Sequence, residues 1–236
     1  MKDPHALSLL NRMISTVGGL PTLQLIEDYK ESGTITYFWA GQPINAVATV
    51  RGRGAAHFRL DSELASGIRT VGVSRLASKL KDEHGSVTEI PLHNAVNMGA
   101  ITLPVLKVIA ALQDPAATIT YVGPLPNGDE KIVDVRIQWP FPDAAHSIPA
   151  LSHLTATDFL IDSQTSLLTE IHTISHPRGT LTRDIPEIYE LSDYRPVNGI
   201  LVPHTIINRL NGQQIWVLHV QKVEFDIGLS NADFDF

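Results

Sequence analysis

The chain contains no cysteine among its 236 residues. This absence excludes a disulfide framework and any metal site built on thiolates. It suits a periplasmic or secreted protein that avoids stray oxidation, although many cytoplasmic proteins lack cysteine too. Long hydrophobic runs are also absent: the long uncharged stretch at residues 90–106, for example, is interrupted by His93, Asn94, Asn97 and Pro104. We therefore expect no transmembrane helix.

Positive charge is scarce. Eighteen Lys and Arg residues stand against 25 Asp and Glu residues, which gives a formal net charge of −7. A nucleic-acid interface normally requires clustered basic residues, and here they are scattered. The acidic balance also provides no electrostatic attraction to anionic lipid. We expect no nucleic-acid partner.

Short catalytic motifs are missing as well. The sequence has no Gly-x-Ser-x-Gly elbow, no His-Glu-x-x-His pair and no P-loop. The run Gly52-Arg53-Gly54 lacks the third glycine of a dinucleotide loop and lies between predicted strands, so we interpret it as a turn or bulge. Catalysis by dispersed groups stays open.

Nothing in the composition divides the chain, which is 43% hydrophobic and 18% charged. Without a Ser/Gly-rich linker, a charge block or a low-complexity tract, residues 1–236 are expected to form a single domain. No signal peptide is evident, because the chain opens with Met-Lys-Asp-Pro and runs directly into a predicted helix. We expect a periplasmic or secreted protein if a leader has been removed, and otherwise a cytoplasmic protein.

The most informative feature that is present is a ladder of three predicted strands, over residues 187–195, 200–210 and 215–225. Asn198-Gly199 and Asn211-Gly212 separate them. Asn-Gly tolerates positive φ at both central positions of a type I′ turn, whose twist matches paired strands. The sequence therefore predicts a long antiparallel meander at its end.

The second turn also predicts a register. With Asn211-Gly212 as a two-residue loop, Ile206 faces Val217 and His204 faces His219. Within the last strand both faces are apolar, since Ile and Val alternate with Trp and Leu. Such a sheet must be covered on both sides or curl around something.

The rest of the chain follows the same pattern. Apolar residues at helical spacing predict helices over residues 4–17, with Asp3 as N-cap, and 104–112. Further strands are predicted over residues 23–29, 33–40, 46–51, 55–60, 68–74, 75–81, 86–90, 117–122, 131–139, 157–161 and 167–175, of which 75–81 could also be helical. Residues 126–128 are a predicted turn, 140–154 an irregular Pro-rich segment and 176–184 a polar loop. The order predicts a mainly antiparallel β fold with a few helices, in the α+β class.

Three passages carry a resemblance to a known family. They are Gly-Thr-Ile-Thr-Tyr at 33–37, Phe-Leu-Ile-Asp-Ser-Gln-Thr-Ser-Leu-Leu-Thr-Glu-Ile at 159–171, and Tyr-Arg-Pro-Val-Asn-Gly-Ile-Leu-Val-Pro-His at 194–204 with the closing residues 228–236. Together they resemble the LolA/LolB-like superfamily of bacterial lipoprotein carriers. The resemblance implies a half-open, curved antiparallel β-barrel that encloses helices and an apolar cavity. The last two phenylalanines, Phe234 and Phe236, are expected to be packing anchors.

Aromatic residues make up only 6% of the chain. Phe38, Trp39, Trp139 and Trp216 are the candidate ligand-binding residues of the implied cavity. Each of these, like Phe58, could equally be a core aromatic within a sheet.

Several histidines are candidate site residues. His204 and His219, if opposite each other, could hold a divalent metal with a third ligand, but no acidic third ligand is apparent. Glu170 and His172 share a strand face and could act as a general base, although a polar pair on a wet face explains them as well. His172 and His176 bracket a strand end. We assign no catalytic residue, no metal site and no cofactor.

The leading functional hypothesis is a periplasmic or envelope protein that binds or carries a lipid, an acyl chain or a lipoprotein-like hydrophobic ligand. The first alternative is a non-catalytic envelope domain for protein interaction or sensing. The second is a hydrolase with dispersed histidine and carboxylate groups, which predicts a cleft where an imidazole meets an acid.

Overall fold

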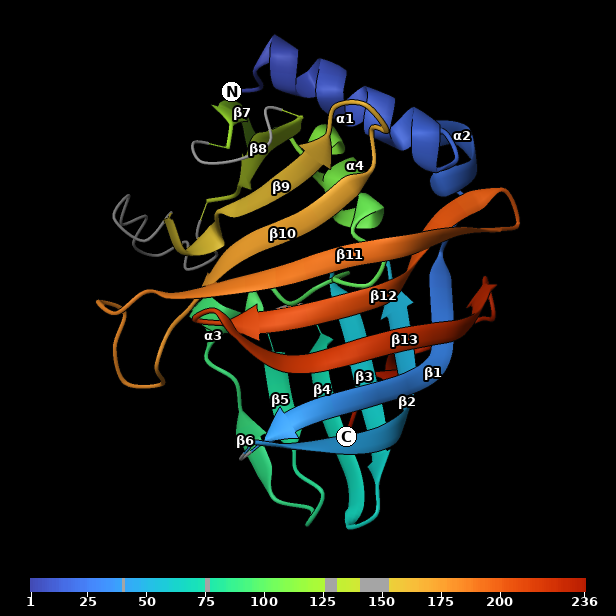
Figure 1. Ribbon diagram of the computed structural model, residues 1–236, viewed down its shortest axis with the longest axis vertical. Coiled ribbons are helices and arrows are strands. Elements are labelled where there is room, and N and C mark those ends of the chain that lie inside the picture. The colour runs from blue at the N-terminus through green and yellow to red at the C-terminus, as the bar shows by residue number, and fades with distance from the viewer. Residues whose placement is uncertain (40, 75–76, 126–130, 141–152) are drawn as a thin grey trace.

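The computed structural model describes residues 1–39, 41–74, 77–125, 131–140 and 153–236 (Figure 1). The helices are α1 (Pro4–Val17), α2 (Leu20–Leu23), α3 (Leu92–Ala95) and α4 (Val105–Gln113), with a 3-10 helix, η2 (Asn231–Asp233), near the C-terminus. The strands are β1 (Asp28–Trp39), β2 (Gln42–Arg53), β3 (His57–Leu64), β4 (Gly67–Ser74), β5 (Ala77–Lys81), β6 (Val87–Glu89), β7 (Thr118–Pro124), β8 (Ile132–Gln138), β9 (Thr157–Asp162), β10 (Leu168–Ser175), β11 (Ile185–Val197), β12 (Ile200–Leu210) and β13 (Gln213–Phe225).

Within the described residues, thirteen strands form one antiparallel sheet in the order β6-β5-β4-β3-β2-β1-β13-β12-β11-β10-β9-β8-β7. The sheet therefore consists of two meanders joined by the pairing of β1 with β13. Helix α3 contacts both β5 and β10, which lie far apart in this order. The sheet must curl to bring these two strands to the same helix (Figure 1). The predicted architecture, an open curved sheet around a few helices, is confirmed.

The first helix has the cap that the sequence predicts. The Asp3 carboxylate accepts hydrogen bonds from the backbone N–H groups of His5 and Ala6, and the helix ends at Val17 before Gly18. These bonds satisfy N–H groups that would otherwise lack partners at a helix start. The buried side of α1 lies against β7, β12 and α4.

Both Asn-Gly loops have the predicted geometry. Asn198 and Gly199 have φ of 50° and 82°, and Asn211 and Gly212 have φ of 50° and 76°. The residues on either side of each loop pair directly.

The register beyond the second loop differs from the predicted one. Arg209 pairs with Gln214 as a two-residue loop requires, but Asn208 pairs with Trp216. Ile215 is therefore the extra residue of a β-bulge, and every later pair is shifted by one.

The predicted pairs Ile206–Val217 and His204–His219 are wrong for this reason. Thr205 is the residue that pairs with His219. Because neighbouring side chains in a strand point to opposite faces, His204 is buried on the inner face and His219 is exposed on the outer face. The bulge excludes a metal site shared by these two histidines.

Smaller differences occur at turns. Residues 20–23 form α2 and β1 begins only at Asp28, so the predicted strand 23–29 is mostly wrong. Gly54, with φ of 55°, starts a turn that delays the strand predicted from residue 55. The hairpin predicted over 75–90 is confirmed by β5 and β6. The turn predicted at 126–128 and most of the irregular segment 140–154 lie outside the described residues.

Two carboxylates secure the junction of β1 and β13. Asp28, which is 3% exposed, accepts hydrogen bonds from the N–H groups of residues 227–229. In return, Asp226 accepts a hydrogen bond from the N–H of Glu27. These reciprocal bonds direct the chain from the end of β13 back across the sheet.

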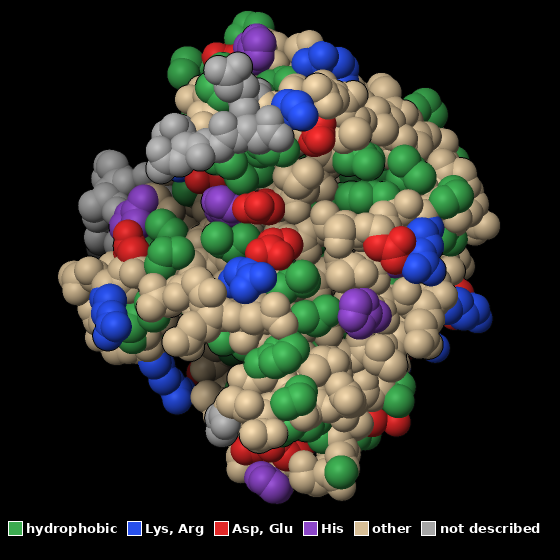
Figure 2. Space-filling model, in the orientation of Figure 1, with side chains coloured by type: hydrophobic (Ala, Val, Ile, Leu, Met, Phe, Trp, Pro, Cys, Tyr) green, Lys and Arg blue, Asp and Glu red, His purple; other side chains and the backbone are tan. Residues whose placement is uncertain are grey.

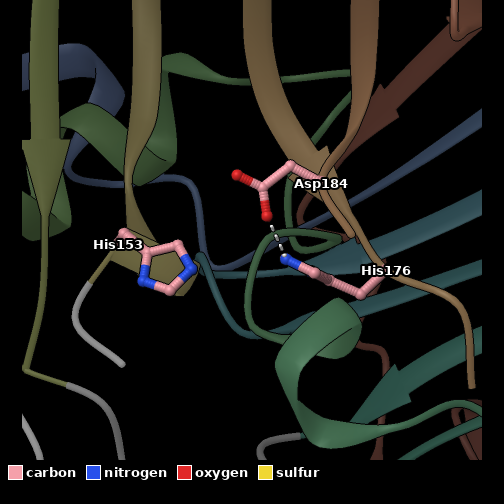
Figure 3. A group of neighbouring side chains, drawn as sticks. All are labelled: His153, His176 and Asp184. Carbon is pink, nitrogen blue, oxygen red and sulfur yellow. Dashed lines mark hydrogen bonds and ion pairs between the residues drawn. The ribbon is translucent and has the colours of Figure 1, made fainter. Parts of the chain in front are cut away.

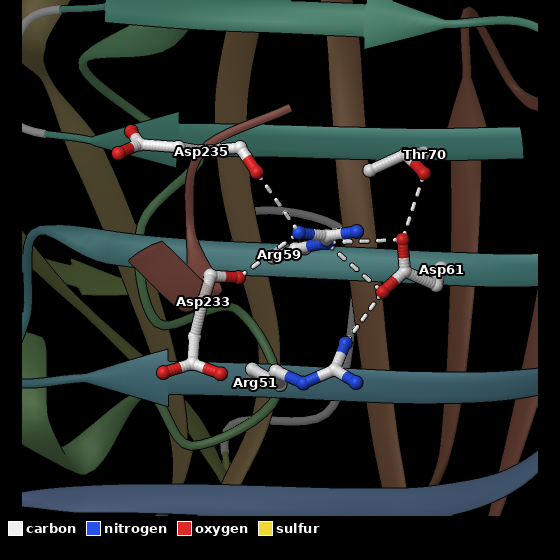
Figure 4. A network of polar contacts seen from close by, with 6 residues as sticks. All are labelled: Arg51, Arg59, Asp61, Thr70, Asp233 and Asp235. Atoms are coloured by element: carbon white, nitrogen blue, oxygen red, sulfur yellow. Dashed lines mark hydrogen bonds and ion pairs between the residues drawn. The ribbon is translucent and has the colours of Figure 1, made fainter. Parts of the chain in front are cut away.

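The chain then runs over an ion-pair network on the outer face of β2, β3 and β4 (Figure 4). Asp61 lies at the centre of this network. It accepts hydrogen bonds from Arg59 at 2.9 and 3.0 Å and from the Thr70 hydroxyl at 2.7 Å, and it forms an ion pair with Arg51. Two arginines on neighbouring strands are thus held by one carboxylate.

The C-terminal residues pack on this network. Arg59 donates to the backbone carbonyls of Asp233 and Asp235, and its guanidinium lies 5.3 Å from the centre of the Phe236 ring. Phe234 is 4% exposed. Both phenylalanines contact the sheet, as expected of packing anchors.

Replacement of Asp28 tests the junction. Asp28→Ala leaves three partly buried N–H groups without their charged acceptor, so we expect the free energy of unfolding to fall by about 3 kcal/mol. Urea denaturation followed by tryptophan fluorescence measures the change. Asp235→Ala is the matched control, because only the backbone carbonyl of this exposed residue contacts the sheet. Equal stability of the two variants would contradict the role given to Asp28.

Candidate functional site

An apolar pocket opens between α3, α4 and the turn that joins β2 to β3. Its volume is about 340 Å³. The lining residues are Ala55, Ala56, Val73, Ala95, Val96, Gly99, Lys107, Ala110, Trp139, Pro140 and Thr155. Most of them are small or apolar, so the pocket offers a ligand hydrophobic walls.

One charged residue lies in this apolar lining. Lys107 belongs to α4 and is only 7% exposed. Its Nζ donates to the Thr157 hydroxyl at 3.1 Å and to the carbonyl of Asn97 at 3.5 Å. No carboxylate of the described ranges forms an ion pair with it. Burial lowers the pKa of Lys107 to about 8, because a low-dielectric environment disfavours the charged form.

The tryptophan of the pocket is fixed in place. Nε1 of Trp139 donates to the Asp114 carboxylate at 3.1 Å, and the Trp139 carbonyl accepts a hydrogen bond from the Thr155 hydroxyl. The Lys107 Nζ lies 5.9 Å from the centre of the Trp139 ring. The ring therefore forms a rigid wall next to the buried cation.

The other candidate aromatics lie elsewhere. Trp39 stacks on Tyr37 with ring centres 4.5 Å apart, and Tyr37 pairs with Trp216 across β1 and β13. Trp39 and Trp216 thus gather on the inner face, outside the lining of the pocket. Phe38 precedes Trp39 in the same strand and points to the opposite face, where it is 37% exposed. Of the four candidates, Trp139 lines the pocket.

A second buried charge lies on the inner face of β1. Glu31 is 1% exposed, and within the described part of the chain neither carboxylate oxygen has a hydrogen-bond partner. Burial raises the pKa of Glu31 to about 7, and the nearby Thr102 hydroxyl offsets this only in part. Phe58, on the same inner face, is 1% exposed and belongs to the core.

A polar cluster of His153, His176 and Asp184 is drawn in Figure 3, and its first residue lies two positions before Thr155 of the pocket lining. Nε2 of His176 lies 2.9 Å from an Asp184 oxygen, and one ligand atom from each of His153, His176 and Asp184 lies within 4.8 Å of the other two. The ring of His93 is 5.6 Å from that of His176. Of these residues, only His176 was a sequence candidate.

The predicted contact between Glu170 and His172 is present. The His172 Nε2 lies 2.5 Å from a Glu170 oxygen, and this imidazole lowers the pKa of Glu170. The pair lies on β10, beside an ion pair between Glu190 and Arg209. On this side of the molecule, charged side chains of both signs lie among hydrophobic ones (Figure 2). The contact between Glu170 and His172 is therefore that of a polar pair on a surface with charged and hydrophobic side chains.

Sequence patterns could have indicated part of this site. Lys107 interrupts the apolar run Val-Leu-Lys-Val-Ile in a predicted helix, and a lysine so placed is a candidate buried cation. Helix α3 gave no signal, since four residues are too few for a periodic pattern. The cluster of His153, His176 and Asp184 joins segments that no spacing rule connects.

Comparison with solved structures identifies the fold. The chain is similar to a LolA superfamily protein from Nitrosomonas europaea, with TM-score 0.59, 10% identity, and 98% of this chain and 97% of that chain covered. A putative outer membrane lipoprotein-sorting protein domain from Vibrio parahaemolyticus gives TM-score 0.56, 9% identity, and coverage of 97% and 95%. A DUF1329 family protein from Desulfovibrio piger gives TM-score 0.58, 11% identity, and coverage of 98% and 96%. The protein has a LolA-like fold.

No protein-family model and no curated protein sequence matches the chain. Within the described ranges, none of the helices has both the length and the apolar character that a bilayer crossing requires.

The pKa of Glu31 makes stability depend on pH. Because the folded state holds this proton more tightly than the unfolded chain, the free energy of unfolding falls as pH rises from about 4.5 to about 7, by about 3 kcal/mol. Glu31→Gln should remove this fall, whereas the exposed control Glu63→Gln should keep it. Urea denaturation across the pH range measures both, and an unchanged pH profile in Glu31→Gln would show that the carboxyl titrates normally.

Proposed function

We propose that this protein binds one amphipathic ligand, with an acyl chain in the apolar pocket and an acidic headgroup at Lys107. It would carry that lipid or lipid-modified ligand within the bacterial envelope. The observation that carries the proposal is the combination of apolar walls with a single buried lysine. The LolA-like fold supports it, as does the likeness to a lipoprotein-sorting domain, although that likeness is one of fold.

The size of the pocket supports a ligand with a single chain. A volume of about 340 Å³ lies near the lower end of the range for small-molecule sites, which is about 300–1,000 Å³. Each methylene moved from water contributes about 0.8 kcal/mol, so about eight buried methylenes supply about 6 kcal/mol. The walls alone would therefore hold one chain without polar recognition.

The buried lysine supports an acidic headgroup. A cation that is desolvated without a carboxylate partner is unfavourable, and an anion brought by the ligand would offset that cost. Trp139 is the ligand contact that we place in this pocket. Trp39, Trp216 and Phe38 stay proposed contacts outside it. A periplasmic location is part of the proposal, and the absence of cysteine is compatible with it.

Filling the pocket should weaken binding of an acyl chain. Ala110 lines the pocket from α4, so Ala110→Trp places a large side chain where the ligand would lie. We expect delipidated protein to take up a fluorescent fatty-acid analogue saturably and the variant to bind at least about tenfold more weakly, the equivalent of about two methylenes. A fluorescence titration measures this.

The matched control is Ala65→Trp, in the exposed turn between β3 and β4. It adds the same side chain far from the pocket and should bind as the unmodified protein does. Circular dichroism verifies that both variants fold. Absence of saturable uptake by the unmodified protein would contradict the proposed function.

The headgroup is tested separately with two ligands of equal chain length, a fatty acid and its methyl ester. The acid should bind more tightly, and its advantage should shrink as pH rises above about 8, because Lys107 then loses its charge. Lys107→Met should bind both ligands equally. Equal affinities for the unmodified protein would contradict the role of Lys107 while leaving chain binding intact.

A further inference from the structure

Two asparagines on and just after α3 hold the two segments that carry His153 and His176. Asn94 receives a hydrogen bond from the His176 N–H at 2.8 Å and donates to the His176 carbonyl at 2.9 Å. Asn97 donates to the carbonyl of Leu154 at 2.8 Å. The backbone of His176 and that of Leu154, the residue after His153, are thus tied to one short stretch of chain, although 23 positions separate the two histidines in the sequence.

The side chains then converge on Asp184 (Figure 3). The His176 side chain is fully buried, and its Nε2 lies 2.9 Å from Asp184 Oδ1. His153 completes a group whose three ligand atoms all lie within 4.8 Å of one another. Two imidazoles and a carboxylate with an open fourth position are the ligand set of catalytic zinc sites in proteins.

A hydrogen-bonded pair of His176 and Asp184 does not account for the whole arrangement. It leaves the buried Nε2 of His93 without a hydrogen-bond partner among the described residues. The His93 ring stands edge-on to that of His176, and the His153 ring is 6.2 Å from His176. Two histidines beside one carboxylate, with a third imidazole packed against His176, suit a shared cation better than they suit a single hydrogen bond.

We propose that His153, His176 and Asp184 form a binding site for a divalent transition-metal ion such as Zn²⁺. In a tetrahedral zinc site with ligands at about 2.0–2.1 Å, the ligand atoms lie about 3.4 Å apart. Asp184 already lies 2.9 Å from Nε2 of His176, so binding mainly requires His153 to approach the other two ligand atoms, by up to about 1.4 Å from a separation of at most 4.8 Å. Water would fill the fourth position, or the imidazole of His93, whose ring packs against that of His176.

Such an ion would fasten the connection 176–184 to the segment that begins at His153. The second of these segments borders the apolar pocket, because Thr155 lines it. Metal binding is thus expected to make one side of the pocket more rigid. The proposed metal site does not depend on which ligand the pocket holds.

The test uses the full chain, prepared without a histidine tag and stripped with a chelator. Isothermal titration calorimetry with Zn²⁺ alone should give one ion per chain, and the melting temperature should rise with Zn²⁺. His153→Ala and Asp184→Asn should each weaken binding by about tenfold or more. His84→Ala, which removes an exposed histidine elsewhere, should leave the affinity unchanged. Mg²⁺, which prefers oxygen ligands, should not compete.

The two variants avoid the buried His176, so that loss of binding is not confused with unfolding; circular dichroism of the zinc-free variants verifies this. Co²⁺ loaded in place of Zn²⁺ should give the absorption bands of a tetrahedral ion with nitrogen and oxygen ligands. Absence of saturable Zn²⁺ binding would overturn the proposal. So would binding that His153→Ala and Asp184→Asn leave unchanged.

Discussion

The pairing of β1 with β13 is the constraint on which the rest of the structure depends. It joins two meanders, one from each half of the chain, into one sheet. Gly33 lies at a bulge in this pairing, where a Cβ atom would stand 2.0 Å from the His219 carbonyl oxygen, so no larger residue fits there without a backbone shift. Asp28 then fastens the chain after β13 to the start of β1. Without the pairing of β1 with β13, the two meanders would not form one sheet that curves around α3.

The curved sheet also buries ionisable side chains inside the molecule. Lys107 and Glu31 are both buried without ion-pair partners in the part of the chain that the structure describes. Burial lowers the pKa of Lys107 and raises the pKa of Glu31, so it favours the neutral form of each. A protein optimised for stability alone would replace such groups by apolar ones. Lys107 lies in a pocket with apolar walls, where an acidic ligand would give its charge a partner. Buried, perturbed groups in a pocket are the usual mark of a functional site.

Local chemistry made much of the fold predictable. Asp3 and the two Asn-Gly dipeptides determine a helix start and two hairpins through contacts within a few residues. The pairing of His204 with His219 could not be predicted, because a single bulged residue, Ile215, reverses the faces of everything beyond it. The pocket depends on contacts between α3, α4 and a turn some fifty residues earlier, and the histidine cluster depends on asparagine bonds to two distant backbones. Such long-range contacts leave no periodic trace in a sequence.

Native mass spectrometry of the protein, purified without detergent or organic solvent, tests the central claim most directly. We expect a complex in which each chain carries one acidic amphiphile, whose mass is lost after organic extraction and restored when a fatty acid is added. A spectrum with the mass of the chain alone, both before and after a fatty acid is added, would contradict the account.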